Sequence, residues 1–97
     1  GRGMRFRMFA QFKGVQIESG FAGIFLEQEI SPGTRTPVAG KIPENLNISS
    51  RWTGKNNSET MSKDDAIRQQ GNLFFIIRAE FIGEILVRNC SLKLKKD

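Results

Sequence analysis

Apolar and polar side chains alternate along the first part of the chain. Every second residue from 4 to 12 is apolar, and the residues between them are Arg, Arg, Phe and Gln, followed by Lys13. Successive side chains of a β-strand point to opposite faces, so this period of two predicts a strand with one buried face. Gly14 interrupts the alternation, which resumes over residues 15–18. We therefore expect a hairpin or a bulge near Gly14 and a turn at Ser19-Gly20.

A second long strand is predicted over residues 21–30, where most side chains are apolar. Gly23 lies within it and favours a bend or a close approach of another backbone. Residues 31–37 have the composition of a loop, in which Pro32-Gly33 suits a tight turn.

The middle of the chain predicts little sheet and one helix. Residues 38–48 contain proline and glycine, so only short extended pieces fit there, with a short edge strand at Leu46 and Ile48. Residues 49–61 are the most polar stretch and are predicted to form a mobile loop. Ser62 offers an N-cap oxygen, acids follow in the first turn, and Gly71 stands where a helix would stop. A helix of two turns is expected over residues 63–70.

The last third predicts strands again. Residues 73–81 are apolar on both faces for much of their length, which is typical of a central strand. Gly83-Glu84 indicates a hairpin turn, and residues 85–94 are expected to return as a strand.

These elements predict a mostly β fold, either all-β or α+β. We expect residues 1–97 to form one small domain, a barrel or a strongly bent antiparallel sheet of five to six strands with one short helix. OB-like, Tudor/SH3-like and PH-like barrels all fit the pattern. Residues 1–3 are expected to be a cloning remnant ahead of Met4.

Composition removes several kinds of chemistry. The 97 residues include no His and one Cys, which excludes nucleophile systems that use His, a zinc site made within the chain and a disulfide. Glu27 and Glu29 share a strand face and could act as paired carboxylates, but such acids are more often solvated. We therefore expect a non-enzymatic protein with no cofactor and no metal.

The compartment is predicted from the same composition. No apolar run is long enough to span a bilayer, and no signal peptide is recognisable. Cys90 is expected to be a half-buried thiol in a reducing compartment. An intracellular location, cytoplasmic or nuclear, is the resulting prediction.

Positive charge is concentrated at the start of the chain. The 15 Lys and Arg outnumber the 10 Asp and Glu, and residues 1–13 carry four cations without an acid. On the predicted first strand Arg5, Arg7 and Lys13 point outward with Phe9 among them. Cations that match phosphates, interleaved with a ring that stacks on bases, suit a surface that binds nucleic acid. The alternative is an edge strand that uses its charges against aggregation, with Phe9 in a second small core.

A second candidate is the segment Arg51-Trp52-Thr53-Gly54-Lys55, where a Trp lies between two cations. Trp52 could stack on a base or on a side chain of a partner, with Arg51 and Lys55 beside it. Alternatively, Trp52 folds back and caps one end of the barrel. The basic tail with Lys93, Lys95 and Lys96 is more typical of a solvated chain end.

The sequence predicts a non-enzymatic binding module. The first hypothesis is that it binds nucleic acid, which could be single-stranded or duplex, DNA or RNA. The alternative is a protein-interaction or oligomerisation domain that uses a strand edge or the apolar excess around Phe74, Ile76 and Phe81. A third hypothesis, a PH-like domain on acidic membranes, rests on charge alone.

Residues 3–8, Gly-Met-Arg-Phe-Arg-Met, resemble the strand that opens the Tudor-like ancillary region of plant auxin response factors. No function is carried over from this resemblance.

Overall fold

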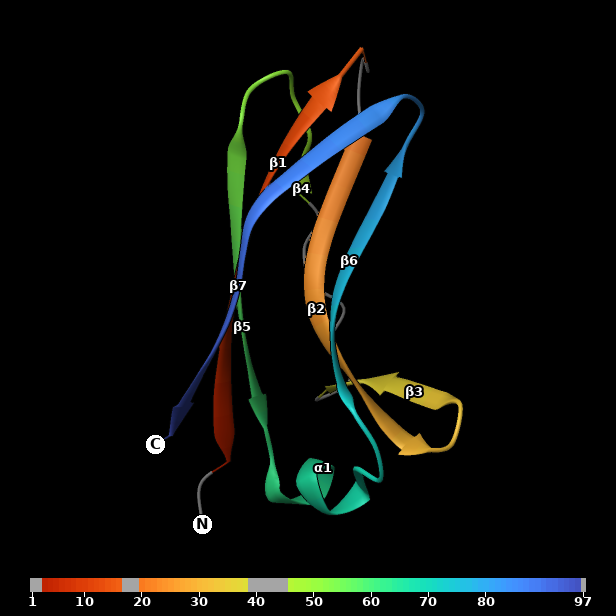
Figure 1. Ribbon diagram of the computed structural model, residues 1–97. Coiled ribbons are helices and arrows are strands. Elements are labelled where there is room, and N and C mark those ends of the chain that lie inside the picture. Colours follow the sequence, from red (N-terminus) through yellow and green to blue (C-terminus); the bar gives the residue numbers. More distant parts are fainter. Residues whose placement is uncertain (1–2, 17–19, 39–45, 97) are drawn as a thin grey trace.

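Two antiparallel sheets make up most of the molecule (Figure 1). The computed structural model describes residues 3–16, 20–38 and 46–96, which hold seven strands and one helix. The elements are β1 (Met4–Val15), β2 (Gly20–Ser31), β3 (Thr34–Pro37), β4 (Leu46–Asn47), β5 (Thr53–Met61), α1 (Lys63–Arg68), β6 (Leu73–Phe81) and β7 (Glu84–Lys96).

Each sheet is organised around one long strand near the N-terminus. In the first sheet, here called sheet A, β1 lies between β5 and β7. In the second, sheet B, β2 pairs with β6 along one edge and with β3 and β4 along the other. β1 and β2 follow each other in the chain but lie in different sheets, and the same holds for β6 and β7. The hairpin predicted at Gly83-Glu84 is wrong, because this turn joins the two sheets.

The core lies between the sheets and follows the predicted alternation. Phe6, Met8, Ala10 and Phe12 of β1 are buried against the inner residues of β2. The cluster is completed by Val38 after β3, Ile48 after β4 and Met61 of β5. The buried face of β1 thus confirms the predicted half-buried strand, which runs on through Gly14 to Val15 instead of breaking there.

The predicted mobile loop over residues 49–61 is wrong. Most of it forms β5, which pairs with β1 from Thr53 opposite Phe12 to Met61 opposite Met4. Its polar composition hid the strand, because two of its inner side chains bond to the backbone of β2 instead of packing as apolar residues. The loop predicted over residues 31–37 does contain the turn at Pro32-Gly33, but Thr34–Pro37 then forms β3.

Three further predictions are wrong: that β6 is a central strand, that the helix continues to residue 70, and that Cys90 is half-buried. β6 has the predicted bounds, yet among the described strands it pairs only with β2 and is an edge strand. Its two apolar faces arise because Phe75 packs on the core while Phe74 lies on the outer face under Arg35. The helix ends at Arg68, before Gly71, because the Gln70 N–H turns to donate to the Glu29 carbonyl (2.9 Å). Cys90 is exposed, next to an irregularity in β7.

The mostly β class is confirmed, with one short helix beside two antiparallel sheets. The sheets do not close into a barrel. Of the two predicted forms, the structure is consistent with the strongly bent antiparallel sheet. Within the described ranges, no helix has the length and apolar character needed to cross a membrane.

Candidate nucleic-acid interface

The outer face of sheet A carries the cations of two strands. Side chains of directly opposed residues in an antiparallel pair lie on the same face. Phe6, Met8 and Phe12 are buried, so the residues between them on β1 point outward together with their partners on β5 and β7. Six cations are brought together in this way, and we call them the basic face: Arg5, Arg7 and Lys13 of β1, with Arg88, Lys93 and Lys95 of β7.

The basic face contains two pairs of like charges in direct opposition. Arg7 lies opposite Lys93, and Arg5 lies opposite Lys95. On the other side of β1 the opposed residues are neutral, Ser58 and Thr60 of β5. In the described part of sheet A, the outward acid nearest to this register is Glu84, which lies opposite Val15 at the far end. The cations of the basic face are therefore not neutralised by carboxylates on their own sheet.

Trp52 belongs to the same face. The Arg88 guanidinium lies 3.9 Å from the centroid of the Trp52 ring, and its Nε donates to Gln11 Oε1 (2.9 Å). Asn89 Nδ2 donates to the same oxygen (2.7 Å). Gln11 is an outward residue of β1, so this contact holds Trp52 at one end of the basic face. A cation over a Trp ring contributes about 0.5–1 kcal/mol at an exposed position.

The remaining predicted residues lie in three different places. Phe9 lies on the basic face, half-buried, between Asn56 of β5 and Ser91 of β7. Arg51 is exposed in the segment that precedes β5. Lys55 lies opposite Ala10, which points into the core, so Lys55 is on the inner face of sheet A and apart from the other cations.

Sequence reasoning missed the contribution of β7 to this face. It interpreted Lys93 and Lys95 as a solvated tail and gave Arg88 no role. The signal in the sequence was the alternation of Leu92, Lys93, Leu94 and Lys95, which has the same period of two as β1. Which strand the tail pairs with could not be read from this pattern.

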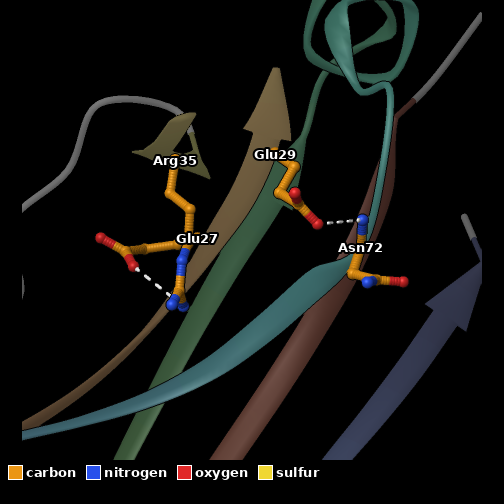
Figure 2. Close-up of polar contacts among 4 residues, drawn as sticks. All are labelled: Glu27, Glu29, Arg35 and Asn72. Carbon is orange, nitrogen blue, oxygen red and sulfur yellow. Dashed lines mark hydrogen bonds and ion pairs between the residues drawn. The ribbon is translucent and has the colours of Figure 1, made fainter. Parts of the chain in front are cut away.

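The acids of β2 are engaged on the opposite side of the molecule. Glu27 Oε1 lies 3.9 Å from Arg35 Nη1, and Glu29 Oε1 accepts a hydrogen bond from the Asn72 N–H (3.1 Å), as Figure 2 shows. The two carboxylates thus have different partners, on β3 and on the segment before β6. Among the described residues, no group of three or more acidic or cysteine side chains is arranged to hold a metal ion.

Comparison of the chain with protein-family models, with curated proteins and with solved structures finds no match.

Proposed function

We propose that the protein is a nucleic-acid-binding module and that the basic face of sheet A is its contact surface. The observation that carries the proposal is the row of like-charge pairs across β1 and β7, Arg7 with Lys93 and Arg5 with Lys95. Like charges in direct opposition destabilise a sheet. A polyanion that lies along the strands removes this repulsion by neutralising both members of each pair.

The spacing of the pairs suits a phosphate backbone. Arg5 and Arg7 are two residues apart on one strand face, a rise of about 7 Å, which is similar to the separation of consecutive phosphates in an extended strand. Each neutralised phosphate releases condensed counterions, so binding through this face depends steeply on salt. Phe9 and Trp52 supply aromatic surface among the cations, as single-strand-binding sheets do.

Charge reversal on β1 tests the proposal directly. We expect Arg5→Glu with Arg7→Glu to weaken binding to labelled DNA and RNA oligonucleotides in fluorescence anisotropy. The plot of log affinity against log salt concentration should become less steep. The magnitude of its negative slope should decrease by about 2, one for each lost phosphate contact.

The matched control is Lys63→Glu with Arg68→Glu, which changes the net charge by the same amount at exposed positions of α1, outside the strands of sheet A. This variant should retain the salt slope of the wild-type protein. Equal binding by the wild-type and the β1 variant, with circular dichroism showing both folded, would contradict the proposal.

The alternative hypothesis, a protein-interaction or oligomerisation domain, stays a prediction. The residues that suggested it lie on different faces of sheet B. Phe74 and Ile76 are half-buried on the outer face, and Phe81 lies on the inner face. Its relevant structural feature is the open side between β6 and β7, where several inner side chains are exposed.

A further inference from the structure

A shallow depression lies within the basic face, centred on β1. It is lined by Arg7, Met8 and Phe9 of β1, Asn56 of β5, and Ser91 and Lys93 of β7, and its volume is about 250 Å³. Pockets for drug-sized ligands measure roughly 300–1,000 Å³, so this depression suits a smaller unit, such as a single nucleotide.

One side of the depression is cationic. Arg7 and Lys93 are directly opposed and both border it. Two neighbouring cations at the border of a small hollow favour an anion beside them, and the guanidinium of Arg7 offers a planar set of donors that matches a phosphate. A phosphodiester group is an anion of the appropriate size and charge.

The other side is aromatic and polar. A Cβ added at Gly54 would lie 2.9 Å from Cε1 of Phe9, so the edge of the ring rests on the backbone of β5. This contact holds the ring in place on the face of the sheet. Asn56 and Ser91 are the residues directly opposed to Phe9, one on each neighbouring strand, and both supply groups that can donate and accept hydrogen bonds.

From this arrangement we infer that the depression is a nucleotide subsite. Arg7 and Lys93 bind a phosphate, the base stacks on Phe9, and Asn56 and Ser91 bond to the edge of the base. The inference rests on the proposed function and narrows it to single-stranded nucleic acid. Bases in a duplex are stacked on one another and cannot reach a ring on a flat sheet.

The test compares three probes with the wild-type protein in fluorescence anisotropy at low salt. They are a single-stranded oligonucleotide, the same strand without its bases, and the corresponding duplex, each as DNA and as RNA. We expect the strand with bases to bind roughly 5-fold or more tightly than the abasic strand, because stacking on an aromatic side chain adds to affinity base by base.

Phe9→Leu then separates stacking from charge. Leu still covers Gly54, and the variant should lose most of its preference for the strand with bases while its affinity for the abasic strand stays the same. Lys93→Gln should weaken binding of both strands. The matched control is Phe21→Leu, which replaces a Phe that is 46% exposed on sheet B and should change neither affinity.

The outcomes are distinguishable. Salt-dependent binding in which the wild-type protein binds abasic strand, duplex and single strand equally would overturn the subsite and leave the proposed function standing. The same conclusion would follow if Phe9→Leu kept the wild-type preference for bases. If the protein bound none of the probes, both the subsite and the proposed function would be overturned.

Discussion

At the scale of single residues, two polar side chains of β5 join the sheets. Between the stretches that pair with β4 and β3, no strand among the described residues lies beside that edge of β2. Asn57 Nδ2 donates to the Ile24 carbonyl (2.8 Å), and the Leu26 N–H donates to Glu59 Oε2 (3.1 Å). Glu59 is only 3% exposed, so its carboxylate is buried where a backbone donor needs an acceptor.

Removal of the Glu59 carboxylate should therefore destabilise the fold. We expect Glu59→Ala to lower the free energy of unfolding by about 1–3 kcal/mol, because the Leu26 N–H is left buried without its acceptor. Urea unfolding measures this loss, and hydrogen exchange should accelerate at the Leu26 amide. Ser58→Ala, on the outer face of the same strand, is the control and should change stability by less than about 0.5 kcal/mol. An unchanged unfolding midpoint for Glu59→Ala would contradict this role.

At the scale of elements, the start of α1 is determined by local sequence and its end by a distant residue. Ser62 and Asp65 form a capping box: the Asp65 N–H donates to Ser62 Oγ (3.1 Å), and the Ser62 N–H donates to Asp65 Oδ2 (3.3 Å). These contacts satisfy backbone donors at the start of the helix. The start was predictable because the cap is local, whereas the end depends on Glu29, which is distant in the sequence.

Loss of this cap should weaken the helix. We expect Ser62→Ala to lower the free energy of unfolding by about 1 kcal/mol, measured by urea or thermal unfolding. Ser50→Ala, at an exposed position outside the helices and strands, serves as the comparison and should be neutral. Equal stability of the two variants would show that the capping box contributes nothing measurable.

The irregularity in β7 is an element-scale feature that no local pattern revealed. The register with β1 shifts between Phe9 and Gln11, and Asn89 has a positive φ of 53°. Asn adopts this left-handed conformation more readily than most residues. The shift places both Arg88 and Asn89 within hydrogen-bonding distance of Gln11, which in turn positions Arg88 over Trp52. One end of the candidate interface therefore depends on a bulge.

At the scale of the whole molecule, the two sheets are open where β6 and β7 diverge from their shared turn (Figure 1). Among the described strands β6 pairs only with β2, and β7 only with β1. Large apolar side chains on the inner faces are consequently exposed by about 39–49%: Ile77, Phe81, Val87, Leu92 and Leu94. Exposed apolar clusters of this kind are typical of surfaces that associate.

The oligomerisation hypothesis makes its prediction at this scale. If a second copy covers the open side, sedimentation velocity should show a larger species as protein concentration rises, and Leu94→Lys should suppress it. Ile67→Lys, at a position 79% exposed on α1, is the control and should leave the association unchanged. A monodisperse monomer at high concentration would contradict this version of the hypothesis.

Local sequence patterns determined the secondary structure where burial follows a simple period. The alternation of β1 fixes which of its residues are core and which are cationic, because side chains on a strand alternate between faces. Ser62 and the acids after it likewise place the start of α1, and the apolar run over residues 73–81 has the bounds of β6. Arg5, Arg7, Phe9 and Lys13 could be placed on one surface for this reason alone.

Only the tertiary structure decided which strands are neighbours. The pattern of β5 was obscured because its inner Asn57 and Glu59 bond to the backbone of β2, a contact between residues far apart in the chain. The pairing of β7 with β1 likewise makes Lys93 and Lys95 part of the basic face instead of a tail. The pairing of β5 with β1 places Lys55 on the other side of the sheet. Strand pairing is a long-range choice made by the packing of two sheets around one core, and a period of two carries no information about the partner.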